Sequence, residues 1–169
     1  LPIYLYIEGY LVTSDVSRAA VLKAREVAKA NGVKTAMTFS DPAMVRFFRA
    51  GIDEMIGDGV DILFCNQEEM SVFTGHDDLT QAIAAIKPFA RKVVVTLGAQ
   101  GALIVDTDGE TRVAANPVTA VDTNGAGDMF AGAFLYGMTH GMSNVQAGQL
   151  ASLAASRIVT VFGARLPKA

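Results

Sequence analysis

The sequence predicts an α/β fold in which a mostly parallel sheet carries helices on both faces, built as a single domain over residues 1–169. Short apolar runs alternate with amphipathic helical patterns along most of the chain. The runs are apolar at successive positions, which indicates strands that are buried on both faces. Charged residues make up 18% of the chain and hydrophobic residues 51%, a composition that excludes a disordered protein.

The first elements follow from strand runs and helix-start signals. A buried strand is expected over Ile3–Ile7. A helix with an apolar stripe follows, capped by Ser14 or Asp15 and stopped at Asn31-Gly32. A second strand covers Lys34–Phe39. Asp41-Pro42 then opens another helix, because the missing N–H of proline costs little at the first helical position.

The middle of the chain continues this alternation. A third short strand is expected over Ile62–Cys65, followed by a helix from about Gln67 to Thr74 that ends at Gly75. Asp77 and Asp78 introduce a helix that runs to about Ile86, and Val93–Leu97 forms a fourth strand. The pattern up to this point is typical of strand–helix–strand units with parallel strands.

The last third begins with a hairpin. Ala102–Asp106 and Thr111–Ala114 flank Asp108-Gly109, a strong hairpin signal, and Val118–Val121 is expected to be one more strand. Two helices follow over about Ala126–Met138 and Asn144–Thr160, the second capped by Ser143. Ligands in such folds bind at the carboxyl ends of strands. We therefore expect the site in the loops after Cys65, Leu97 and Val121.

Charge, cysteine content and hydropathy exclude several roles. The formal net charge is −3, so the chain has no excess of basic residues to neutralise a phosphate backbone. Nucleic-acid binding is therefore disfavoured as its main role. The single cysteine, Cys65, cannot form an internal disulfide and suits a reducing cytoplasm. Residues 129–156 lack charged side chains, but polar residues interrupt them, which favours two buried helices over a membrane span. The chain starts at Leu1 directly in an apolar run, so we expect a fragment of a longer protein.

A glycine-rich loop is the strongest functional signal. Residues 122–128 have the sequence Asp-Thr-Asn-Gly-Ala-Gly-Asp and lead into the uncharged helix. Three small residues at a helix start let backbone N–H groups converge on an oxyanion or phosphate, helped by the positive end of the helix dipole. Asp128 falls in the first turn. An ordinary acidic residue at a helix start would explain Asp128, but not the three small residues before it.

Other phosphate-binding motifs do not fit the loop. The sequence has no Gly-x-x-x-x-Gly-Lys-Ser/Thr, which excludes a P-loop. Gly125-Ala126-Gly127 begins a Gly-x-Gly-x-x-Gly pattern, but Phe130 occupies the third glycine position. A dinucleotide-binding oxidoreductase is therefore a disfavoured alternative. Asp106-Thr107-Asp108-Gly109 lacks the later ligands of a calcium loop and is better explained as the hairpin turn.

Three motifs in order resemble the ribokinase-like (PfkB) family of ATP-dependent sugar and nucleoside kinases. Residues 122–134 resemble the C-terminal signature of that family. Asn66-Gln67-Glu68-Glu69 resembles its Asn-x-x-Glu motif, and residues 96–101 resemble its Thr-x-Gly-x-x-Gly nucleotide loop. The resemblance covers at least residues 66–164. It implies a ribokinase-like α/β fold and transfer of the γ-phosphate of ATP to a hydroxyl group.

The resemblance also implies roles for the glycine-rich loop. Asp128 would be the catalytic base that takes the proton of the acceptor hydroxyl. The N–H groups of Gly125, Ala126 and Gly127 would stabilise the transferring phosphoryl group, in agreement with the anion site that the residues themselves predict. Asp122 and Asn124, with carbonyls near Val161 to Ala164, would hold a monovalent cation such as K⁺.

The two upstream motifs would complete the nucleotide site. The resemblance implies that Thr96, Gly98 and Gly101 line the ATP groove. Asn66 and Glu69 would help to place Mg²⁺ and its waters beside the triphosphate, as hard oxygen ligands should. The residue-level alternative for Glu69 is a simple helix-start charge. Cys65 is expected to be a packed thiol, and His76 and His140 to be exposed loop residues.

The sequence also departs from the family pattern. The N-terminal part, with its early Gly-Gly motif, lid strands and most acceptor-binding residues, is missing. The chain is therefore expected to be the C-terminal nucleotide-binding portion of a longer cytoplasmic kinase, poorly active alone and inclined to form a homo-oligomer through exposed apolar surface. Asn124 resembles the adenosine-kinase branch, but one residue does not decide between a nucleoside and a sugar. The alternative function is a non-catalytic nucleotide-binding module that uses the same loop.

Overall fold

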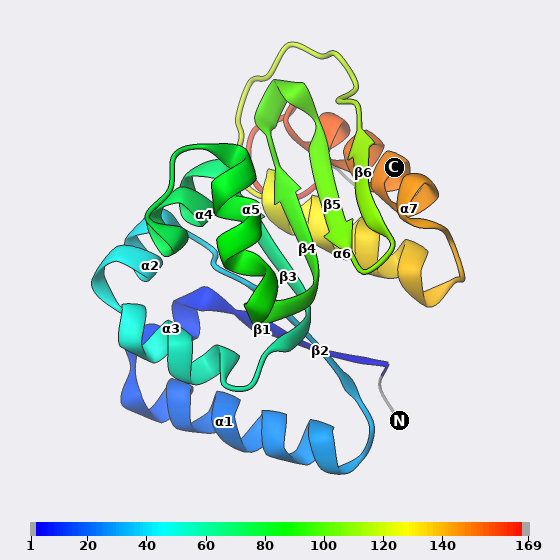
Figure 1. Cartoon of the computed structure of the whole chain (residues 1–169). Helices are drawn as coiled ribbons and strands as arrows, with labels where there is room; N and C mark the ends of the chain where they lie inside the picture. The colour runs from blue at the N-terminus through cyan, green and yellow to red at the C-terminus, as the bar shows by residue number, and fades with distance from the viewer. Residues whose placement is uncertain (1–2, 167–169) are drawn as a thin grey trace. The chain divides into compact units, whose positions relative to one another are not determined.

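The computed structural model describes residues 3–166 and divides the chain into two compact units, Leu1–Val95 and Thr96–Ala169. Strands and helices alternate in the first unit, and a hairpin with two helices forms the second (Figure 1). The predicted α/β fold class is confirmed. Within the described residues, no helix is both long enough and apolar enough to cross a membrane.

The strands of the first unit follow one another in the sheet in their chain order. β1 pairs in parallel with β2, and β2 in parallel with β3. The strands are β1 (Tyr4–Glu8), β2 (Lys34–Thr38), β3 (Val60–Asn66) and β4 (Ala90–Thr96). Four consecutive side chains of β3, from Ile62 to Cys65, are at most 5% exposed. Both faces of this strand are therefore covered, as its continuous apolar run predicts.

The helices of the first unit begin where their capping residues predict. They are η1 (Gly9–Thr13), α1 (Asp15–Ala30), α2 (Pro42–Phe47), α3 (Arg49–Ile56), α4 (Gln67–Thr74), α5 (Leu79–Ile86) and η2 (Lys87–Phe89). Ser14, Asp41 and Asp78 each accept a backbone N–H as N-caps of α1, α2 and α5. The helix expected after Asp41 is two helices, because Phe48 leaves the helical conformation with φ −124° and ψ 29°.

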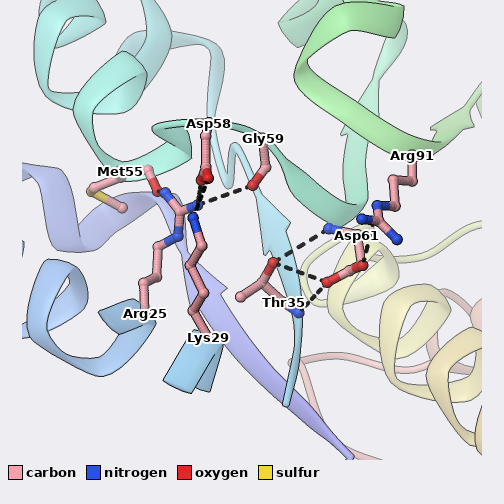
Figure 2. Close-up of polar contacts among 8 residues, drawn as sticks. All are labelled: Arg25, Lys29, Thr35, Met55, Asp58, Gly59, Asp61 and Arg91. Carbon is pink, nitrogen blue, oxygen red and sulfur yellow. Dashed lines mark hydrogen bonds and ion pairs between the residues drawn. The ribbon is translucent and has the colours of Figure 1, made fainter. Parts of the chain in front are cut away.

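A polar cluster lies at the amino ends of β2, β3 and β4 (Figure 2). Arg25, Asp61 and Arg91 of this cluster line a hollow of about 630 Å³. Arg25 of α1 donates to the carbonyls of Met55 and Gly59, which lie at the end of α3 and just after it. A cation near a helix C-terminus is favourable, so these contacts serve the packing of α1 on α3. Thr35 and Arg91 in turn contact the carboxylate of Asp61.

The second unit is built on the hairpin of β5 (Ala102–Asp106) and β6 (Gly109–Val113), preceded by the short helix η3 (Gly98–Gln100). α6 (Ala126–Thr139) and α7 (Asn144–Ile158) pack against each other, and α7 also contacts the hairpin. A Cβ on Gly148 of α7 would lie 2.6 Å from a methyl carbon of Val113, so this glycine permits the close approach. Ser143 caps α7 with a capping box, as predicted.

The strand expected over Val118–Val121 is absent, which corrects the sequence-based prediction. Residues 114–120 adopt neither helix nor strand, and Val118 and Val121 are 48% and 50% exposed. The amide of Val121 donates to the carbonyl of Val159, beyond the end of α7, rather than to a neighbouring strand. Two apolar positions beside Pro117 indicated a strand, but they found no partner strand to bury them.

Candidate functional site

The glycine-rich loop, residues 122–128, enters α6 through Gly125, which is the N-cap of that helix with φ 76°. No side chain caps this end. The Ala126 N–H donates to the carbonyl of Thr123 at 3.2 Å, whereas no side chain accepts the amides of the first turn. A Cβ on Gly125 would lie 2.7 Å from the Cβ of Ala164. Both the left-handed backbone and this contact require glycine. The uncapped helix start is therefore suited to an anionic ligand.

Asp122 ties this loop to the chain beyond α7. One carboxylate oxygen accepts the N–H of Asn124 and the other that of Gly163, both at 2.9 Å. These two bonds, first that from Asn124, lower the pKa of the Asp122 carboxyl. The backbone N–H of Asp122 also donates to the carbonyl of Val159 at 3.2 Å. Asp122, one of the two predicted cation ligands, thus contacts Gly163 in the segment 161–164, and the cation role of Asp122 and Asn124 stays a prediction.

A cavity of about 520 Å³ in the second unit brings together residues of two predicted motifs. Thr96, Gly98 and Gly101 line it from the loop after β4, and Ala126 and Gly127 line it from the start of α6. This volume is typical of small-molecule sites. The two loops that the sequence singled out after Leu97 and Val121 therefore face one hollow.

The turn after β4 has a shape that only glycine permits at its end. The amide of Leu97 donates to the carbonyl of Gly101 at 2.8 Å, which closes the turn. Gly101 has φ 91°, and a Cβ there would lie 1.9 Å from the carbonyl oxygen of Val113 in β6. The second glycine of this motif is thus fixed by the hairpin, whereas the space around Gly98 is open.

The sequence analysis missed the other residues that line the same cavity. They are Asn116, Pro117, Val118 and Ala120 from the loop before α6, and Ser152, Ala155, Ser156 and Val159 from α7 and its C-terminal end. Ser152 and Ser156 are buried, and their spacing of four places them on one face of the helix. Small polar residues at helical spacing, within the stretch 129–156 that has no charged side chain, were the available signal.

Asn66 and Glu69, in the first unit, form a reciprocal capping box at the carboxyl end of β3. The side-chain oxygen of Asn66 accepts the Glu69 N–H at 2.8 Å. The Glu69 carboxylate accepts the backbone and side-chain N–H groups of Asn66, each at 3.0 Å. Glu69 is only 5% exposed, and burial raises its pKa to about 7, with Asp41 adding to the rise. The helix-start role is therefore realised, and a metal role stays a prediction.

The carboxylates of Asp122 and Glu69 offer oxygen atoms as possible metal ligands. Among residues 3–166, no group of three or more His, Cys, Asp or Glu side chains is arranged to hold a metal ion. Each Glu69 oxygen accepts one N–H and keeps a second lone pair, so this carboxylate can still bind a hard divalent cation.

The remaining candidates lie as follows. Asp128 is exposed in the first turn of α6, directly after the cavity-lining Gly127. Cys65 is buried in β3, and burial raises the pKa of its thiol, which confirms a packed cysteine. His76 and His140 are exposed and outside helices and strands, as predicted.

Comparison with known proteins gives a family match over nearly the whole chain. Residues 2–169 match the family described as "pfkB family carbohydrate kinase". Adenosine kinase of Schizophyllum commune is 32% identical over 182 residues, covering 94% of this chain and 52% of that protein. The crystal structure of adenosine kinase from Sinorhizobium meliloti has a TM-score of 0.92 at 34% identity, covering 97% of this chain and 51% of the other.

A ribokinase II of E. coli solved with ATP and Mg²⁺ is also similar, with a TM-score of 0.87 at 27% identity over 96% of this chain and 54% of the other. The chain thus spans about half the length of the relatives that it matches.

Proposed function

Because the chain belongs to the pfkB family of carbohydrate kinases, we propose that it is the nucleotide-binding portion of an enzyme that phosphorylates a sugar or nucleoside with MgATP. In this reaction the acceptor hydroxyl oxygen bonds to the γ-phosphorus, the bond to the β-phosphate oxygen breaks, and ADP leaves. The observation that supports the proposal most directly is the single cavity that two nucleotide-kinase motifs line together.

The loop at the start of α6 would provide the chemistry of transfer. Amides of Gly125, Ala126 and Gly127, at an uncapped helix start, would stabilise negative charge on the transferring group. Asp128 would take the proton of the acceptor hydroxyl as that oxygen attacks. Phosphoryl transfer depends mainly on positioning and charge stabilisation, so a rigid loop held at Asp122 suits it.

Cations would complete the site. Mg²⁺, when bound, supplies charge neutralisation for the phosphates, and Asn66 and Glu69 are the residues that would hold it through its oxygen ligands. Asp122, Asn124 and carbonyls of residues 161–164 would hold a monovalent cation such as K⁺. Thr96, Gly98 and Gly101 would line the groove for ATP.

The acceptor would be an adenosine-like or ribose-like molecule. The relatives that cover most of this chain include adenosine kinases, and Asn124 resembles that branch. A reducing, cytoplasmic setting belongs to the same proposal, because the chain's one cysteine is buried and unpaired within the described residues.

Calorimetric titration with MgATP tests the nucleotide placement. Gly127→Leu adds a side chain at a cavity-lining position where a Cβ meets nothing within 4 Å, so the helix should remain intact. Gly132→Leu in the same helix is the matched control, since that glycine is exposed, equally open and outside the cavity. We expect the Kd to rise at least about tenfold for Gly127→Leu and to stay within about twofold for the control.

Two results would contradict this placement. One is a Gly127→Leu protein that binds as tightly as the control, and the other is a wild-type chain, folded by circular dichroism, that shows no saturable binding.

Turnover of the whole enzyme tests the catalytic role. We expect Asp128→Asn to lower kcat by roughly 10²–10⁴ while the Kd for ATP stays unchanged. Normal turnover in this variant would show that Asp128 is not the base. ATP binding without transfer to any sugar or nucleoside in the wild-type enzyme would instead support the non-catalytic nucleotide-binding module.

A further inference from the structure

The sequence holds two Asn-Gly pairs, and one of them lies inside the glycine-rich loop. Asn31-Gly32 follows α1, and Asn124-Gly125 precedes α6. In such a pair the backbone nitrogen of glycine can attack the side-chain amide carbon of asparagine, because glycine has no Cβ to hinder the approach. Both asparagines are exposed, so access of water does not distinguish the two pairs. The hydrogen bonds around each glycine do distinguish them.

The amide of Gly32 is fixed in the C-terminal cap of α1. Its N–H donates to the carbonyl of Lys29 at 3.3 Å, and the N–H of Val33 donates to the carbonyl of Ala28 at 2.9 Å, which together form a Schellman motif. The Asn31 side chain is held as well, since its Nδ2 donates to a carbonyl of the last helical turn at 2.8 Å. Attack within this pair therefore requires the end of the helix to open first.

The amide of Gly125 is not held in this way. Within residues 3–166 its N–H donates no hydrogen bond, although Gly125 is the N-cap of α6. The side-chain amide of Asn124 bonds to the Asp122 carboxylate, two residues earlier in the same loop. Rotation of the Asn124 side chain towards the Gly125 nitrogen therefore exchanges one bond within a loop for bonds to water and opens no helix.

We propose that Asn124 is a site of spontaneous deamidation, and that the modified loop no longer fits its anion. The Gly125 nitrogen bonds to Cγ of Asn124, the bond from Cγ to Nδ2 breaks, and Nδ2 leaves as ammonia with the proton that the Gly125 nitrogen loses. Water then opens the resulting succinimide ring to aspartate or isoaspartate. Water is the only co-reactant, and nothing is oxidised or reduced.

Both products change the loop where it is most constrained. Isoaspartate lengthens the main chain by one carbon between residues 124 and 125, and Gly125 has no space for an added carbon on the side of Ala164, where a Cβ would lie 2.7 Å from the Cβ of Ala164. Aspartate adds a carboxylate directly before the amides of the first turn of α6, which disfavours an anion there. This consequence rests on the proposed function, whereas the modification itself does not.

Storage of the folded 169-residue chain at mildly alkaline pH, followed by mass spectrometry of its peptides, measures deamidation at each asparagine. We expect Asn124 to deamidate at least about fivefold faster than Asn31, because only the second pair needs a helix end to open. In urea, which abolishes the Schellman motif, the two rates should agree within about twofold.

Three results would overturn the proposed modification. They are an intact Asn124 after storage, a rate at Asn124 no higher than that at Asn31 in the folded chain, and the same ratio of rates in urea, which would assign the difference to local sequence rather than to the fold. Asn124→Gln is the control variant, because attack on its longer side chain would form a less favourable six-membered ring. It should lose the modification at residue 124, and an unchanged slow rate at Asn31 would show that α1 remains folded.

Calorimetric titration with MgATP tests the consequence for the loop. Chains modified at residue 124 carry one more negative charge and can be separated from unmodified chains by ion exchange. We expect their Kd for MgATP to be at least about tenfold higher. Equal affinity of the two fractions would overturn the proposed effect on the anion site. An unmodified chain that binds no MgATP would overturn the proposed function instead, and the deamidation rates would still stand.

Discussion

Replacing Glu69 with glutamine should flatten the dependence of stability on pH and should stabilise the protein above neutral pH. The carboxylate is 5% exposed, and burial raises its pKa from 4.5 to about 7 in the folded protein, with like charges at Asp41 and Glu68 adding to the rise. The hydrogen bond from the Asn66 N–H favours the charged form and opposes the shift.

The sign of the effect follows from proton linkage. The folded state binds the Glu69 proton more tightly than the unfolded state, because the pKa is higher in the folded state. This contribution to stability is full below about pH 4.5 and is lost as the pH rises through about 7. At about 1.4 kcal/mol for each pKa unit, the wild type should lose about 2 to 3 kcal/mol between pH 5 and pH 8 through this residue.

Glutamine is a suitable replacement because this chain already uses it in the same role. In the capping box of α7, the Gln146 side-chain oxygen accepts the backbone N–H of Ser143 at 3.0 Å. The Glu69→Gln side chain can therefore accept the backbone N–H of Asn66 without carrying a charge into the buried site. It loses the bond from the Asn66 side-chain amide, and this loss is the same at both pH values. The packing of α4 should be unchanged.

Urea unfolding at pH 5 and pH 8, without divalent cations, measures the effect. We expect the difference between the two pH values to be about 2 to 3 kcal/mol smaller for Glu69→Gln than for the wild type. Glu68→Gln, at the exposed neighbouring position, removes only the smallest contribution to the raised Glu69 pKa and should keep most of the wild-type pH difference. An equal pH difference in the wild type and Glu69→Gln would refute the reasoning. Added Mg²⁺ at pH 8 should stabilise the wild type more than Glu69→Gln, if Glu69 holds the metal.

Two further pairs of variants, one pair in each unit, test packing by urea unfolding. Gly101→Ala should lower the free energy of unfolding by at least about 2 kcal/mol more than Gly109→Ala does. Both positions have a positive φ, but only at Gly101 would the added Cβ meet a backbone oxygen. Equal losses in the two variants would exclude this steric explanation. Arg25→Met should lower the free energy of unfolding by about 2 kcal/mol, because two carbonyls lose their hydrogen-bond donor. Lys29→Met removes only an exposed ion pair and should lower it by less than about 1 kcal/mol. Similar losses in the two variants would contradict this difference.

The parts of the fold that the sequence predicted well depend on neighbours two or three residues apart. Ser14, Asp41, Asp78 and Ser143 all cap helices as expected, because an N-cap contacts an amide only two or three residues later. The Asn66–Glu69 capping box is of this kind too, although the sequence analysis offered only a helix-start charge as the alternative role of Glu69. Local chemistry of this sort needs no knowledge of the rest of the chain.

The parts that escaped prediction depend on contacts between distant residues. Val118–Val121 has the composition of a strand but lacks a partner, and the pairing of Val121 with Val159 could not be inferred from either segment alone. Likewise, Ser152 is near Asn116 only because α7 packs beside the loop that precedes α6. These lining residues of the cavity could therefore not be predicted, although both motifs that line the same cavity could be recognised.

The glycine-rich loop combines both kinds of information. Its small residues and its place before a helix predict an anion site from the sequence alone. The reason that Gly125 in particular must lack a side chain is Ala164, which meets the position of its absent Cβ, and Asp122 holds the same two segments together through the Gly163 N–H. The segment after α7 has no recognisable motif, yet its residues Gly163 and Ala164 contact the glycine-rich loop. A change at Ala164 to a larger residue should therefore disturb the anion site as directly as a change within the motif itself.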